Sequence, residues 1–119
     1  MKQTNGAHIP TKGTPDSIGY DVKAVTSSTI QPGKIEKIGT GLSTAFSNDI
    51  YLRIAPRSSL ALKHLTVEGG VVDSDYRGEI VVLLKNSSAK PFHVATGQKI
   101  AQFIFEQANI PYVQTTAEL

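Results

Sequence analysis

The chain has 119 residues, with 12 basic and 10 acidic side chains and a formal net charge of +2. This charge is small and neither sign forms a run, so it gives no electrostatic reason to expect nucleic-acid binding. The absence of cysteine excludes structural disulfides and thiolate metal sites. No apolar run approaches the roughly 18 residues that a membrane-spanning helix needs.

The N-terminal residues 1–10 are polar and lack the apolar centre of a secretion signal, so we expect an intracellular protein, in the cytoplasm or nucleus. The length suits one core and is too short for two, which predicts a single domain over residues 1–119. Apolar residues make up only 39% of the chain. This modest supply would be eased if several copies shared buried surface.

Strand signals dominate the chain from end to end. Segments rich in β-branched and aromatic residues, bounded by turn residues, predict strands at 19–25, 35–38, 42–46, 50–54, 80–84, 92–94 and 100–105. The run 80–84 is apolar throughout, which predicts burial on both faces. Many short strands at this spacing indicate an all-β sandwich or barrel. Only 58–64 predicts a helix, of about two turns.

The segment Pro56–Ala61 places an arginine and two serines where a strand leads into the predicted helix. Unpaired backbone amides at a helix start favour an anion, and Arg57 beside them would add a two-pronged phosphate ligand. The alternative is that Ser58 only caps the helix while Arg57 forms a surface ion pair. The segment alone leaves both interpretations open.

Two further polar side chains stand in apolar strands. Asp21 must be hydrogen-bonded or lie near a cation, so it either contacts water around a Mg²⁺ ion or forms a salt bridge with an arginine. Gln102 either donates its amide to a phosphate oxygen or satisfies backbone groups at a sheet edge. Both alternatives stay open for each residue.

The most informative run, Gly69–Ile80, combines glycines and acidic residues with a tyrosine and an arginine. Gly70 permits close backbone approach to a ligand, and a hairpin can bind the edge of a flat base through its own N–H and C=O groups. A turn is expected between Asp73 and Asp75. A tight hairpin with solvated acids is the alternative, but it does not explain the two apolar residues that place Asp73 beside buried surface.

Four segments together resemble the first four motifs of the trimeric dUTP pyrophosphatases. The resemblance spans roughly residues 14–118, and the motifs are Ile18–Val22, Pro56–Ala61, Gly70–Glu79 and Gly97–Gln102. It implies an all-β, jelly-roll-like fold with one short helix, assembled as a homotrimer with active sites between subunits. It also implies Mg²⁺-dependent hydrolysis of dUTP to dUMP and pyrophosphate, which keeps uracil out of DNA, with no nucleic-acid or membrane partner.

The same resemblance implies a role for each site residue. Asp73 is expected to orient the attacking water, and the ring of Tyr76 to pack under deoxyribose and exclude a 2′-hydroxyl. The hairpin through Gly70, Val71 and Val72 is expected to bind uracil through its backbone. The remaining expected contacts are to phosphate, from Arg57, Ser58, Ser59 and Gln102, and to the metal-bound triphosphate through water, from Asp21.

Several features depart from the family pattern. Ser59 and Ile18 stand where many members have glycine and alanine, and Gln98-Lys99 replaces a common Asp-Arg pair in the style of retroelement-encoded members, which is compatible with a virion location. The glycine-rich fifth motif, which closes over the nucleotide, has no counterpart in residues 1–119. We therefore expect slow hydrolysis, with a nucleotide-binding trimer in signalling or scaffolding as the alternative.

A deoxycytidine triphosphate deaminase, which shares this fold, is set aside because Leu83 stands where its catalytic glutamate is required.

Overall fold

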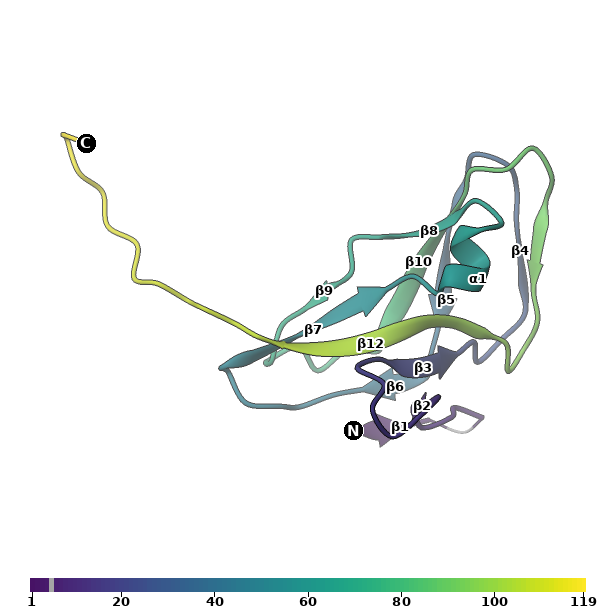
Figure 1. Ribbon diagram of the computed structural model, residues 1–119, viewed down its shortest axis with the longest axis horizontal. Helices are drawn as coiled ribbons and strands as arrows, with labels where there is room; N and C mark the ends of the chain where they lie inside the picture. The colour runs from purple at the N-terminus through teal and green to yellow at the C-terminus, as the bar shows by residue number, and fades with distance from the viewer. Residues whose placement is uncertain (5) are drawn as a thin grey trace.

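The computed structural model describes residues 1–4 and 6–119, which contain twelve strands and one short helix (Figure 1). The elements are β1 (Lys2–Gln3), β2 (Thr11–Lys12), β3 (Tyr20–Lys23), β4 (Ser28–Ile30), β5 (Ile35–Gly39), β6 (Leu42–Ser43), β7 (Ile50–Ala55), α1 (Ser58–Ala61), β8 (Leu65–Glu68), β9 (Val71–Val72), β10 (Val81–Asn86), β11 (Phe92–Val94) and β12 (Lys99–Gln107). The predicted all-β class with one short helix is confirmed.

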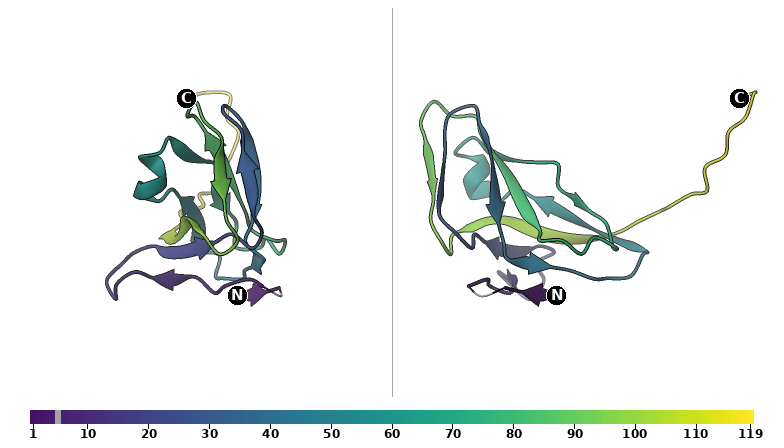
Figure 2. Two further views of the ribbon diagram at one scale, coloured as in Figure 1. Left: turned by 90° about the vertical axis from the view of Figure 1, so that its right-hand side faces the viewer. Right: turned by 180° about the vertical axis from the view of Figure 1, so that it is seen from behind.

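The larger sheet has five strands in the order β2-β3-β12-β7-β9, and a second sheet has the order β5-β10-β8. Two further pairs, β1-β6 and β11-β4, complete the structure, and the β4-β11 pair stands at the end of the molecule away from the C-terminus (Figures 1 and 2). Every pairing is antiparallel. Consecutive strands repeatedly change sheet, which produces a jelly roll rather than a simple meander.

The core lies where the inner faces of these sheets meet. Leu52 on β7 and Phe103 on β12 are fully buried, and they belong to the same apolar cluster as Val82 and Leu84 on β10. The expected burial of 80–84 on both faces is wrong for the single chain, because Val81 and Leu83 are only half-buried. An antiparallel strand that packs on the core with one face alternates in this way.

The helix is also shorter than expected. Helix α1 covers Ser58–Ala61, one turn rather than two, and Leu60 is its buried residue. Turn hydrogen bonds from the Lys63 amide to the Leu60 carbonyl and from the His64 amide to the Ala61 carbonyl extend the segment to His64. The φ angle of 65° at His64 then ends it before β8. A helix with so small an apolar face gains little from packing, and short helices are marginal without it.

Beyond β12, residues 108–119 leave the body of the molecule without forming a strand or helix (Figure 1). This segment carries the exposed apolar side chains of Ile110, Tyr112 and Val113. The one helix of the described residues is too short to cross a membrane.

The end of β10 depends on Asn86, a polar side chain with no exposed surface. Its amide nitrogen Nδ2 donates to the carbonyl oxygens of Ile30 at 2.9 Å and Lys90 at 2.8 Å, and its Oδ1 accepts from the Ser88 amide at 3.0 Å. This side chain therefore joins β10 to β4 and shapes the turn that leads to β11.

We predict that Asn86→Ala lowers the free energy of unfolding by about 1–3 kcal/mol, because the carbonyl of the buried Ile30 loses the Asn86 donor. Urea unfolding measures the change. The control is Asn109→Ala in the exposed C-terminal segment, which should change stability by less than about 0.5 kcal/mol. Equal unfolding midpoints for the two variants would contradict the role of Asn86.

Candidate functional site

The turn from β8 into β9 is built by two glycines. Gly69 and Gly70 have φ angles of 67° and 95°, in the left-handed region that favours glycine. The Ile54 amide on β7 donates to the Gly70 carbonyl at 2.7 Å. A Cβ atom on Gly70 would lie 2.9 Å from the Ile54 carbonyl oxygen. Gly70 is therefore required both by its φ angle and by its close approach to β7.

Strand β9 borders a hollow of about 320 Å³, a size within the usual range of small-molecule sites. The residues expected to bind the nucleoside all line it, namely Gly70, Val71, Val72, Asp73 and Tyr76. Its other walls are mostly apolar, from residues such as Ile54, Ile80 and Leu83. Because β9 is the last strand of its sheet, it also has unpaired N–H and C=O groups on its free side.

The loop after β9 sets the directions of Asp73 and Tyr76. The Tyr76 amide donates to the Asp73 carbonyl at 3.1 Å, so the turn expected between Asp73 and Asp75 is confirmed. The Tyr76 hydroxyl donates to the Glu79 carbonyl at 2.9 Å. A Cβ atom on Gly78 would lie 2.5 Å from that hydroxyl oxygen, so glycine at 78 leaves room for the ring. Tyr76 stays accessible to a ligand, since it is 45% exposed and lines the hollow.

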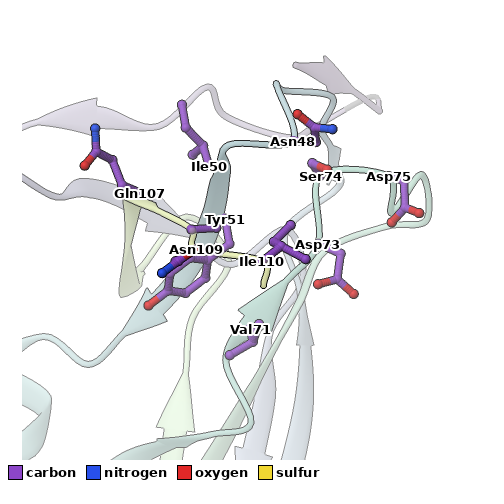
Figure 3. Close-up of a pocket in the computed structure, with 11 residues that line it drawn as sticks. Asn48, Ile50, Tyr51, Val71, Asp73, Ser74, Asp75, Gln107, Asn109 and Ile110 are labelled. Carbon is purple, nitrogen blue, oxygen red and sulfur yellow. The ribbon is translucent and has the colours of Figure 1, made fainter. Parts of the chain in front are cut away.

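A second, larger hollow of about 680 Å³ also borders β9 (Figure 3). Val71 and Asp73 reach it too, together with Tyr51 from β7 and Ile110 from the C-terminal segment. Asp73 thus stands between two concave surfaces, and it is exposed to both.

The other expected site residues gather around Asp21 on β3. Its Oδ1 lies 3.4 Å from Arg57 Nε, and its Oδ2 lies 3.6 Å from Lys99 Nζ. The salt-bridge interpretation of Asp21 and the ion-pair interpretation of Arg57 therefore both describe this structure. Such partly exposed pairs add little stability. Two cations around one carboxylate leave an excess positive charge, which favours an anionic ligand.

Gln102 and the serines complete this group. Gln102 Nε2 donates to the Pro56 carbonyl at 3.1 Å, as expected if it satisfies backbone groups. Gly19 makes room for it, since a Cβ atom there would lie 2.0 Å from Gln102 Oε1. The N-cap of α1 is Arg57 and has no side-chain capping bond, so the interpretation of Ser58 as a cap is wrong. Ser58 and Ser59 are exposed beside Arg57.

The structure does not join these two groups within one chain. A hollow of about 570 Å³ is lined by Asp21 and Gln102 but by none of the residues around β9. In the sheet, β12 and β7 lie between β3 and β9. Three strand spacings separate β3 from β9 by about 14 Å. A single chain therefore presents a nucleoside-sized hollow and a cationic cluster at separate places.

Sequence reasoning missed a hydrogen-bonded network on the outer face of the larger sheet. Arg53 Nε donates to Glu106 Oε1 at 2.8 Å, and the Tyr51 hydroxyl donates to Glu106 Oε2. The bonds from Tyr51 and Arg53 lower the pKa of the Glu106 carboxyl, and the bond to Glu106 raises the pKa of the Tyr51 hydroxyl. Only the register that sets Glu106 opposite Tyr51 would have revealed this network.

Within residues 1–4 and 6–119, no three His, Asp or Glu side chains converge on a point where they could hold a metal ion. Asp21 is the carboxylate that Arg57 and Lys99, the two residues of the cationic cluster, both approach. A Mg²⁺ ion bound largely by phosphate oxygens and water needs few protein ligands, and one carboxylate that contacts its water is compatible with that donor set.

Comparison with known proteins decides what this arrangement belongs to. A protein-family model described as dUTPase matches residues 5–119. The chain belongs to the dUTPase family. The resemblance found in the four sequence motifs is thereby confirmed.

Viral dUTPases are similar to this chain in sequence. The deoxyuridine 5′-triphosphate nucleotidohydrolase of vaccinia virus (strain Copenhagen) is 41% identical over all 119 residues, which correspond to 81% of the viral protein. The protein of the same name from monkeypox virus is also 41% identical over 119 residues, or 79% of its length.

Solved phage dUTPases share the fold. The dUTPase of phage phi11 of S. aureus matches with a TM-score of 0.91 at 18% identity, over 98% of this chain and 94% of that one. A mutant dUTPase of Staphylococcus bacteriophage 80alpha with dUpNHpp also has a TM-score of 0.91 at 18% identity, over 98% and 86% of the two chains. A mutant of the phi11 enzyme shows the coordination of a structural Mg(II) ion.

The two glycines before β9 offer a matched pair of variants. Both have positive φ, so alanine strains the backbone at either position, but only the Cβ at 70 meets the Ile54 carbonyl; at 69 the nearest atom is Leu83 Cδ1 at 3.9 Å. We predict that Gly70→Ala weakens nucleotide binding by at least tenfold (about 1.4 kcal/mol) more than Gly69→Ala. Calorimetric titration with dUMP measures both. Equal losses would mean that the close approach at Gly70 has no effect beyond strain.

Proposed function

We propose that this protein hydrolyses dUTP to dUMP and pyrophosphate, which would keep uracil out of DNA and supply dUMP. Membership of the dUTPase family supports the proposal, as do relatives named deoxyuridine 5′-triphosphate nucleotidohydrolase. The observation that carries it is the hollow beside β9, where an edge strand, the ring of Tyr76 and the carboxylate of Asp73 surround one nucleoside-sized space.

In this proposal the nucleoside half of the substrate occupies that hollow. Uracil lies against the backbone of the hairpin through Gly70, Val71 and Val72, on the free side of β9, and deoxyribose lies on the ring of Tyr76. A site that pairs polar groups of the correct base rejects analogues that leave those groups unpaired. Asp73 holds the attacking water as general base, a role that contributes typically ~10²–10⁴-fold to rate.

The triphosphate binds at the cationic cluster. Arg57 supplies a two-pronged donor, and Ser58, Ser59 and Gln102 supply neutral donors. A bound Mg²⁺ ion would neutralise charge on the phosphates. Asp21, which lies between Arg57 and Lys99, would contact the water around that ion.

The working unit in this proposal is a homotrimer with sites between copies. Each site combines the hollow beside β9 of one copy with the cationic cluster of another. The separation of about 14 Å between β3 and β9 within one chain supports this arrangement. Residues 1–119 act as one catalytic domain, and the expected intracellular location remains part of the proposal.

The deciding experiment is an assay of pyrophosphate release with dUTP, dTTP, dCTP and UTP in Mg²⁺. We predict hydrolysis of dUTP at least about 10²-fold faster, as kcat/KM, than of the other three, because the site rejects analogues that leave its polar groups unpaired. Binding of dUMP without release of pyrophosphate would instead favour a nucleotide-binding role, and equal rates for all four would exclude a uracil-specific site.

Mixing two inactive variants tests the shared site. Asp73→Asn and Arg57→Met should each lower turnover by ~10²–10⁴-fold, because one loses the base and the other a phosphate ligand. When the two are unfolded, mixed and refolded together, some sites receive both native residues from different copies. We predict that activity returns in the mixture and not in either variant refolded alone. A mixture as slow as its parents would place both residues of a site in one copy.

A further inference from the structure

The arginine of the Gly69–Ile80 run has no part in the site described above. Arg77 lines neither hollow beside β9, and within the described residues no carboxylate lies within salt-bridge distance of it. Its Nη1 atom instead points at three backbone carbonyl oxygens: Ser74 at 2.7 Å, Thr44 at 3.3 Å and Tyr76 at 3.4 Å. A charged side chain is thus used entirely for backbone contacts.

These contacts matter because the loop has little else to hold it. Residues 73–79 include no buried residue, although Val72 and Ile80 on either side are buried. The turn itself is closed by the single backbone bond from the Tyr76 amide to the Asp73 carbonyl. Hydrogen bonds from a charged donor are stronger than neutral ones, so Arg77 is the strongest donor available to this loop.

The contacts also connect the loop to the rest of the fold. Ser74 and Tyr76 belong to the loop, whereas Thr44 follows β6 and lies at a buried position. At the end of the loop, Glu79 Oε2 accepts from the Gly41 amide at 2.9 Å, between β5 and β6. The loop is therefore tied twice to the chain around β6, once through Arg77 and once through Glu79.

We propose that Arg77 is a positioning residue that fixes the carboxylate of Asp73 by clamping the turn that follows it. The proposal rests on the proposed hydrolysis of dUTP. Arg77 acts through Asp73 and does not touch the nucleotide. Because a misplacement of about 1 Å in a reacting group costs on the order of 10²-fold in rate, a loosened turn reduces turnover more than binding.

The first test compares Arg77→Met with Arg77→Lys. Methionine keeps much of the aliphatic stem and removes every donor, so kcat should fall about 10²-fold while KM changes less than about threefold. Lysine keeps a charged donor for Ser74 and should recover at least tenfold of that loss. Lys90→Met, on the exposed loop between β10 and β11, is the control and should leave kcat unchanged.

A double-mutant cycle separates positioning from general stabilisation. If Arg77 acts through Asp73, then Arg77→Met should lower kcat much less in an Asp73→Asn background than in the native one. Independent losses that multiply would overturn the proposal. So would a native kcat in folded Arg77→Met at temperatures below its unfolding transition. If the methionine variant does not fold, the lysine variant replaces it in the cycle.

Hydrogen exchange gives a readout that does not depend on activity. The Tyr76 amide, bonded to the Asp73 carbonyl, should exchange at least tenfold faster in Arg77→Met than in the native protein, whereas the Val82 amide in β10 should not change. Unchanged protection of Tyr76 would overturn the clamp even if dUTP is hydrolysed. Loss of protection in a protein that does not hydrolyse dUTP would retain the clamp and reject the proposed function.

Discussion

The register of β12 between β3 and β7 is the constraint on which the rest of the structure depends. Gln102 on β12 lies opposite Asp21 on one side and Ala55 on the other, and the chain continues from Ala55 to Arg57. A shift of one residue would turn Gln102 into the core and expose Phe103, which is fully buried. The apolar alternation that buries Phe103 therefore also assembles the cationic cluster.

The two halves of the proposed site are built by different physics. The residues of the cationic cluster lie on or directly after inner strands of the larger sheet, so the packing of the core fixes their positions. The hollow beside β9 is lined by an edge strand and an exposed loop, where backbone geometry and hydrogen bonds, rather than buried side chains, hold the residues in place. Gly70 brings β9 against Ile54, and Arg77 and Glu79 tie the loop to the chain around β6. One half therefore depends on core packing, and the other depends on a few hydrogen bonds and one close backbone contact.

The sequence predicted elements whose signals are local. Strand β11 matches the expected range, and β7 and β12 differ by a few terminal residues, because their β-branched and aromatic runs are continuous. The strands β1, β2, β4, β8 and β9 were missed because they are short and are defined by pairing partners elsewhere in the chain, as β4 is by β11 and β8 by β10. The third motif groups residues that line one hollow beside β9. The contacts of Asp21 with Arg57 and Lys99 could be located only from the register of the sheet.

The free edge of β9 has a consequence for how the protein behaves in a concentrated solution. Unpaired strand edges invite other chains to extend the sheet, which leads to aggregation. Here the exposed edge is only two residues long, and it is bounded by the paired glycines on one side and by the charge of Asp73 on the other. A strand from another chain would find too few free backbone groups to pair with stably, whereas a flat base needs hydrogen bonds to only one or two of them. The brevity of β9 thus protects the protein from self-association through this edge, while the edge stays open to a small ligand.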